Sequence, residues 1–164
     1  MTTDEACRYL EDLFHADLKG NALLTNDFFR WRQFPIVNNQ NWSFENVVLL
    51  GDALHTANFS IGSGTKLALE DSIALATSMH AGGALPAALK AFRELREPSK
   101  QKVLQAAYAS MLWIERLDER LGLEPIEFAY EMVTRSKRID YQNLKRRAPE
   151  FVARYETWQQ NQTD

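Results

Sequence analysis

Cysteine is almost absent from this chain of 164 residues, and long apolar runs are missing from it. The one cysteine, Cys7, cannot form a disulfide within the chain, which favours a reducing compartment. No apolar run approaches the roughly 18 residues of a membrane-spanning helix, and the acidic start at Asp4 and Glu5 is unlike a basic secretory signal. These absences predict a cytoplasmic protein without a membrane span.

An excess of charge of either sign is also lacking. The formal net charge is −3, from 19 Lys and Arg against 22 Asp and Glu. Domains that bind nucleic acid usually carry a strongly basic surface, so we expect no nucleic-acid partner. The three histidines, His15, His55 and His80, do not have the i, i+4 spacing of a metal-ligand pair on a helix. We therefore expect no metal site.

Helical patterns account for most of the chain, and its 45% apolar content is enough for the core of one domain. Capping signals and apolar periodicity predict helices over residues 4–18, 66–80, 86–121, 125–135 and 140–160. Pro98 should kink or break the longest of these, and Pro149 should divide the last. Residues 27–34 and 47–50 predict short strands. The expected fold is mostly α with a small β remnant.

The segment from Gly51 to Thr65 is the strongest candidate for a site. It reads Gly-Asp-Ala-Leu-His-Thr-Ala-Asn-Phe-Ser-Ile-Gly-Ser-Gly-Thr and joins an apolar strand to the helix predicted from Lys66. A helix N-terminus carries unpaired backbone amides and the positive end of the helix dipole, and glycine lets a ligand approach the backbone closely. The segment therefore predicts a pocket for a polar or anionic group.

This string resembles the second flavin-contacting motif of the single-component FAD-dependent aromatic hydroxylases. It is most similar to the branch that acts on aromatic CoA thioesters, the anthraniloyl-CoA monooxygenases and salicylyl-CoA 5-hydroxylases. Matching segments flank the motif, at residues 9–14 and 31–34 before it and at 128–130 and 134–139 after it. The resemblance therefore extends over most of the chain.

The resemblance implies a role for each part of the loop. The Asp52 carboxylate would accept hydrogen bonds from ribityl or ribose hydroxyls of FAD, and amides around Gly62–Thr65 would face the flavin pyrimidine edge. The implied cofactor-binding residues are Gly51, Asp52, Gly62, Ser63, Gly64 and Thr65, and the substrate-facing residues are His55, Asn58, Phe59 and Ser60. His55 could instead bond a loop carbonyl. NAD(P)H would be the electron donor of the complete hydroxylase, which we call the parent enzyme.

The chain departs from the family in two respects. Many aromatic hydroxylases carry Pro-Pro where Asn58-Phe59 stands, so no proton-transfer role is assigned to Asn58. The family also holds the ADP pyrophosphate on a strand, a G-x-G-x-x-G turn and a helix. Gly62 and Gly64 form the only G-x-G pair here, so the chain is expected to be a C-terminal portion that lacks the βαβ unit.

This expectation sets the domain organisation. Residues 1–46 would be a remnant of the substrate domain, 47–81 the flavin-contacting strand, loop and helix, and 84–164 a C-terminal helical region. Alone, the chain should bind FAD weakly or not at all and should be inactive. It should pair with a separate nucleotide-binding half, or self-associate through the surfaces left uncovered.

Three interpretations of function stay open. In the first two, the parent enzyme hydroxylates an aromatic substrate, which is a CoA thioester in one and a free indole or phenol in the other. In the third, the chain is a non-enzymatic helical interaction module. The basic residues Arg135, Lys137, Arg138, Lys145, Arg146 and Arg147 could meet CoA phosphates or form a solvated face. An interaction module would use the apolar stripe Val103, Ala107, Met111, Ile114, Leu117 and Leu121. Glu70-Asp71 could hydrogen-bond near the loop or complement the helix dipole.

Overall fold

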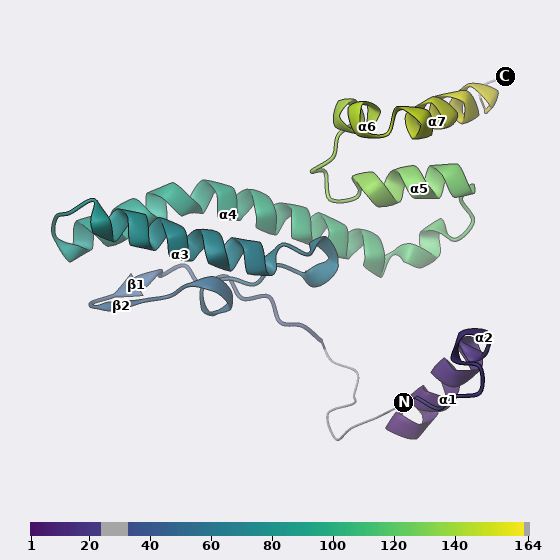
Figure 1. Cartoon of the computed structure of the whole chain (residues 1–164), viewed down its shortest axis with the longest axis horizontal. Helices are drawn as coiled ribbons and strands as arrows, with labels where there is room; N and C mark the ends of the chain where they lie inside the picture. The colour runs from purple at the N-terminus through teal and green to yellow at the C-terminus, as the bar shows by residue number, and fades with distance from the viewer. Residues whose placement is uncertain (24–32, 163–164) are drawn as a thin grey trace. The chain divides into compact units, whose positions relative to one another are not determined.

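The computed structural model describes residues 1–23 and 33–162, which divide between two compact units, 1–34 and 35–164 (Figure 1). The first unit contains α1 (Thr3–Leu13) and the short α2 (His15–Leu18). Thr2 and Glu5 cap α1 reciprocally, each side chain bonding the other's backbone amide. The predicted helix over 4–18 is thus confirmed, with an interruption at Phe14. Most of the strand predicted over 27–34 lies outside the described residues.

A small antiparallel hairpin begins the second unit. In it, β1 (Ser43–Phe44) pairs with β2 (Val47–Val48). The strand predicted over 47–50 is confirmed for Val47–Val48 only. The Leu49 amide still donates to the carbonyl of Trp42 at 2.9 Å, but the backbone then turns at Gly51, where φ is +53°.

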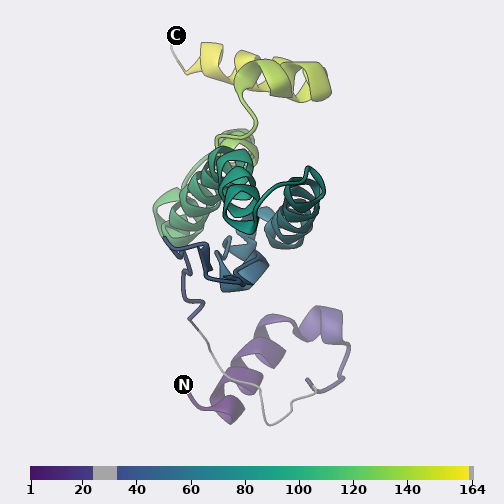
Figure 2. The ribbon, with the colours of Figure 1, turned by 90° about the vertical axis from the view of Figure 1, so that its left-hand side faces the viewer.

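Two long helices, α3 (Gly64–His80) and α4 (Leu85–Glu115), lie side by side, and the hairpin lies below them in the view of Figure 1 (Figures 1 and 2). Their core is formed by Trp42, Leu54, Ala74 and Phe92. The rings of Trp42 and Phe92 meet edge to face, with centroids 5.3 Å apart. This core fixes the hairpin and the turn after it against the helix pair.

Helix α4 runs through Pro98 without interruption, so of the predicted kink or break, the break does not occur. An interior proline removes a backbone hydrogen bond and costs about 3 kcal/mol. Side chains on both sides of it are buried against neighbouring elements, namely Ala88, Phe92, Arg96, Lys100, Ala106, Ala107 and Ser110. Because this burial continues past the proline, the packing holds the helix together across it.

Helix α4 also ends at Glu115, earlier than the predicted Leu121, and the tight turn η3 (Leu117–Arg120) follows it. Helices often tighten to this geometry at their ends. The predicted stripe through Leu121 is therefore not one continuous helix face. Leu121 itself is 75% exposed.

The C-terminal part contains α5 (Pro125–Thr134), α6 (Tyr141–Arg147) and α7 (Pro149–Asn161). The predicted division at Pro149 is confirmed. The rings of Tyr130 and Tyr155 stack 3.9 Å apart and join α5 to α7. Over the described residues the chain is mostly α with one two-stranded sheet, as predicted. None of the helices described is both long and apolar enough to span a bilayer.

Candidate functional site

The turn after β2 is the first part of the site. It forms the short helix η1 (Gly51–Ala53), and the amides of Leu54 and His55 both donate to the carbonyl of Gly51, at 2.9 and 2.8 Å. A Cβ added at Gly51 would lie 3.1 Å from Cβ of Ala68 on α3, at a positive φ that favours glycine. Gly51 thus lets the turn approach α3 closely and leaves Asp52 exposed beside it.

The loop between this turn and α3 is built on side-chain and backbone caps. Asn58 accepts the amide of Ser60 at 3.0 Å and caps η2 (Phe59–Ile61). Gly62 then reverses the chain with φ +59°, and Ser63 is the N-cap residue of α3. The loop therefore reaches α3 through the chain reversal at Gly62 and the N-cap position at Ser63.

An open hollow of about 590 Å³ lies over this N-terminus, and we call it the flavin hollow after the flavin-contacting motif that this loop resembles. Its lining consists of Asp52, Ala57, Phe59, Gly62, Ser63, Gly64, Thr65 and Ala68. The structure thus brings six of the sequence-predicted site residues together in one place. Gly51 lies buried beneath the turn, and His55 is also buried.

The floor of the flavin hollow is rich in backbone donors. The amides of Gly64, Thr65 and Lys66 open α3 and have no acceptor within the helix. A Cβ added at Gly62 or Gly64 would meet no atom within 4 Å, so the glycines leave open space there. This geometry suits the edge of a flat, polar ligand that accepts hydrogen bonds.

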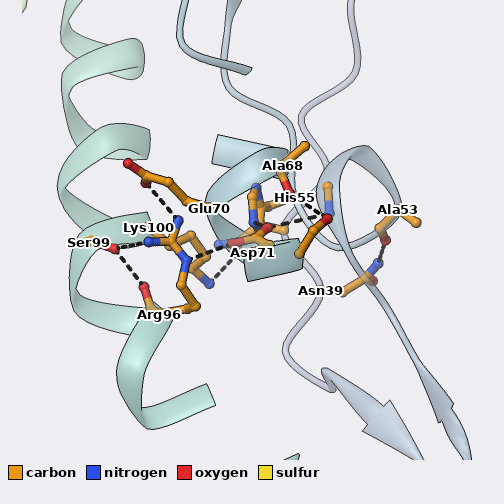
Figure 3. A network of polar contacts seen from close by, with 12 residues as sticks. Asn39, Ala53, His55, Ala68, Glu70, Asp71, Arg96, Ser99 and Lys100 are labelled. Atoms are coloured by element: carbon orange, nitrogen blue, oxygen red, sulfur yellow. Dashed lines mark hydrogen bonds and ion pairs between the residues drawn. The ribbon is translucent and has the colours of Figure 1, made fainter. Parts of the chain in front are cut away.

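A buried cluster of charges lies under the same turn (Figure 3). Asp71 of α3 is 0% exposed, and its Oδ2 is 2.8 Å from Nε2 of His55. Its Oδ1 accepts Nε of Arg96 from α4 at 2.9 Å, and Oδ2 also accepts the Gly51 amide at 3.4 Å. We call Asp71, His55 and Arg96 the Asp71 cluster. Two roles were predicted for Glu70-Asp71, hydrogen bonding near the loop or complementing the helix dipole. The contacts of Asp71 match the first role.

The surroundings of Asp71 hold it in the charged form. Burial raises the pKa of its carboxyl, but hydrogen bonds from His55 and Arg96 outweigh burial and leave the pKa below its ordinary value. Because a carboxylate only accepts hydrogen bonds, the proton between the two groups belongs to Nε2 of His55. The imidazole therefore points inward. It bonds a carboxylate and not the loop carbonyl that was the alternative, and its contact with substrate stays a prediction.

Two arginines from the C-terminal part reach the loop. Nη2 of Arg135 donates to the carbonyl of Ser60 at 3.0 Å, and its Nε donates to the buried hydroxyl of Ser110 at 3.0 Å. Nη1 of Arg138 donates to Oγ of Ser63 at 2.9 Å. The basic segment near the end of the chain is therefore partly engaged with the flavin hollow.

Asn58 faces a second cavity of about 310 Å³ on the α4 side of the loop. Lys100 lies on its wall, 5% exposed, with Nζ 3.3 Å from Oδ1 of Asn38 and 4.9 Å from the ring centre of Trp42. Burial lowers the pKa of this ammonium. Asn58 and Phe59, both predicted to face substrate, thus face different spaces.

Sequence reasoning missed Arg96, Lys100 and the reach of Arg135 and Arg138 to the loop. No local pattern signals contacts between residues so far apart in the chain. Asp71 did carry a signal, because it lies on the same helix face as Leu67, Ala74 and Ser78, which are buried. A carboxylate on a buried face needs partners. Within the described residues, no group of three or more His, Cys, Asp or Glu is placed to hold a metal.

Comparison with known proteins shows relatives along most of the chain, although no family model matches it. The chain is 38% identical over 161 residues to a salicyloyl-CoA 5-hydroxylase from a Streptomyces species, a match that covers 96% of this chain and 31% of that protein. It is 39% identical over 136 residues to the 3-hydroxy-4-methyl-anthranilyl-[aryl-carrier protein] 5-monooxygenase of Streptosporangium sibiricum, covering 82% of this chain and 37% of that protein.

A shorter match carries the cofactor in its name. An FAD-dependent monooxygenase of Aspergillus terreus is 35% identical over 78 residues, which are 41% of this chain and 20% of that protein. The chain thus spans about a third of the length of the two bacterial relatives. The resemblance to the FAD-dependent aromatic hydroxylases is confirmed: over most of its length, this chain is homologous to a segment of these monooxygenases.

Proposed function

We propose that this chain is the segment of an FAD-dependent aromatic monooxygenase that binds the isoalloxazine and ribityl end of the cofactor. The observation that carries the proposal is the flavin hollow, which gathers Asp52, Phe59 and Gly62–Thr65 over the N-terminus of α3. Its size is within the range of cofactor sites. The relatives that match most of the chain are aromatic monooxygenases by name.

The residues of the hollow would divide the work of binding. The exposed Asp52 carboxylate accepts hydrogen bonds from the sugar-alcohol chain, and the free amides at Gly64–Lys66 donate to the pyrimidine edge of the ring. A helix N-terminus favours negative charge there by about 0.3–1 kcal/mol. When bound, FAD supplies the redox chemistry with oxygen and with electrons from NAD(P)H, and the protein supplies orientation and electrostatics.

The proposed substrate is an aromatic acyl thioester. The names of the two bacterial relatives carry a salicyloyl-CoA and an anthranilyl group on a carrier protein, both aromatic acyl compounds. Phe59 lines the flavin hollow and is 71% exposed, and its aromatic side chain would contact the ring of such a substrate. His55 is buried, so we assign it a supporting role under the turn.

A nucleotide-binding partner segment completes the proposal. FAD held at one end only loses the contacts that its diphosphate makes with a helix N-terminus. Leu69 and Ile73 form an apolar patch one turn apart on α3, 60% and 66% exposed, which such a segment would cover. When nothing covers this patch, the chain would self-associate.

Titration of FAD fluorescence tests the proposal. The chain alone should purify colourless and bind FAD weakly, and adding the nucleotide-binding segment of a relative should tighten binding and restore a flavin spectrum. A yellow preparation of the chain alone, with stoichiometric FAD, would show that no second segment is needed. Absence of FAD binding in both samples would refute the flavin function.

A further inference from the structure

We propose that the Asp71 cluster is the positioning device for Asp52: it sets the conformation of the η1 turn and thereby the place of the Asp52 carboxylate in the flavin hollow. The inference rests on the proposed function for the meaning of Asp52. The positioning itself is a property of this chain and can be measured without a cofactor.

The first step is the way Asp71 holds both ends of the turn. Its Oδ2 contacts the Gly51 amide at 3.4 Å and Nε2 of His55 at 2.8 Å, so one oxygen meets the residues just before and just after Asp52–Leu54. With both ends attached to one fixed atom, the short segment between them has little freedom. Asp52 is the one residue of that segment that lines the flavin hollow.

The second step is what fixes Asp71 itself. Its other oxygen accepts Nε of Arg96 on α4 at 2.9 Å, and Nη2 of Arg96 lies 3.1 Å from Oε2 of Glu70 (Figure 3). The same guanidinium donates through Nη1 to Oγ of Ser99 at 2.7 Å. The carboxylate is thus tied to two helices at once and cannot follow the loop if the loop moves.

The third step separates this role from ordinary packing. Asp71 and His55 are 0% and 2% exposed, and neither lines the flavin hollow, so they have no direct contact with a ligand there. Buried charged groups cost free energy unless they are paired, and an apolar pair would fill the same space without that cost. The charged pair differs from an apolar pair because its hydrogen bonds fix the orientation of the turn.

Amide hydrogen exchange on the full chain, without FAD, tests the positioning. The backbone amides at positions 54 and 55 donate to the Gly51 carbonyl. In His55→Ala, both amides should exchange about tenfold faster, because the turn loses one buried hydrogen bond. His55→Gln should keep protection near that of the parent chain, since its side-chain amide can still donate to Asp71. The Val152 amide in α7 reports global unfolding.

A spectroscopic signature adds an independent readout. The Nε2 proton of His55 should give a slowly exchanging NMR signal, which Asp71→Asn removes and Glu94→Gln leaves in place. Glu94 is a matched control, because its contact with Lys90 is exposed. If Asp71→Asn does not fold, the two His55 variants decide the matter. Equal exchange rates of the two turn amides in His55→Ala and His55→Gln would overturn the inference. So would an acceleration at Val152 as large as that in the turn, because it would mean that the whole fold had lost stability.

A double-mutant cycle on FAD binding, with the partner segment present, links the turn to the cofactor. If His55 acts through Asp52, His55→Ala should weaken FAD binding about tenfold, and adding Asp52→Ala should cost little beyond Asp52→Ala alone. If the losses of FAD affinity in the two single variants add fully in the double variant, the inference is overturned, but the flavin function still stands. If no FAD binds, the proposed function fails, and the exchange data still decide whether the cluster positions the turn.

Discussion

Nη1 of Arg138 lies 2.9 Å from Oγ of Ser63, although 75 residues separate them in the chain. Ser63 is the N-cap residue of α3 and lines the flavin hollow. The C-terminal part of the chain therefore holds the loop in place through a charged donor. Arg135 adds a second tie at Ser60.

Removing this tie should loosen the loop without unfolding the helices. Arg138→Ala should lower the free energy of unfolding by about 1 kcal/mol, because the hydrogen bond has a charged donor but the side chain is exposed. Urea unfolding measures the loss, and limited proteolysis should show earlier cleavage near Ser60–Ser63. Arg146→Ala, at an exposed position on α6, is the control and should change neither. Identical behaviour of the two variants would contradict the tie.

Asp52→Ala should weaken FAD binding in the chain combined with its nucleotide-binding segment. The expected loss is about 1.5–3 kcal/mol, the value of hydrogen bonds to a charged group. Isothermal titration measures it, and circular dichroism should show unchanged helix content, since Asp52 is exposed. Asp118→Ala removes an equally charged, exposed residue outside the hollow and should bind FAD normally. Normal binding by Asp52→Ala would make Asp52 a structural turn residue only.

Acid should weaken the fold through Asp71. Its pKa in the folded chain lies below the ordinary value of 3.8, so the stability that its carboxylate adds is fully present above that pH. The contribution falls as the pH drops through the lower folded-state pKa. At neutral pH, Asp71→Asn should lower the free energy of unfolding by about 3 kcal/mol, because Arg96 loses its buried partner.

The pH dependence of that difference is the decisive measurement for Asp71. The gap between the two proteins should shrink in urea unfolding series taken below about pH 4. Comparing the same two chains cancels the contribution of the other carboxyl groups. A gap that is constant with pH would mean that the charge of Asp71 is not what stabilises the fold.

Pro98→Ala should stabilise the chain. The helix continues through this exposed proline, so alanine restores a backbone donor without disturbing buried side chains. We expect a gain of about 2 kcal/mol in thermal or urea unfolding. Gln101→Ala, also exposed on α4, should stay within about 0.5 kcal/mol of the parent chain. No gain at Pro98 would mean that the helix is shaped around the proline.

The apolar patch on α3 should control self-association. Replacing Leu69 and Ile73 with Gln should shift the mass from light scattering toward that of a monomer, at concentrations on the order of tens of micromolar. Leu95→Gln changes a residue of similar exposure, 58%, on α4 and should leave the mass unchanged. If the unsubstituted chain is already a compact monomer, the exposed patch on α3 does not drive self-association, and the prediction is wrong.

Local signals in the sequence were sufficient for the main elements and for the outline of the site. Apolar periodicity and capping residues predict the helices, and Gly51 and Gly62 mark the turns of the loop. These features depend on neighbours in the chain, so they can be inferred from it. Pro98 shows the limit of such rules, because burial on both sides of it outweighs the local penalty.

Tertiary structure decided which distant residues complete the site. The sequence by itself determined that the chain is mostly helical and that Asp52 and Gly62–Thr65 share a loop. Only the packing of α3 against α4 placed Arg96 at Asp71, and only the fold of the C-terminal part brought Arg138 to Ser63. Such pairings are set by the summed burial of many side chains. A turn or helix follows from residues a few positions apart, whereas these contacts have no local cause.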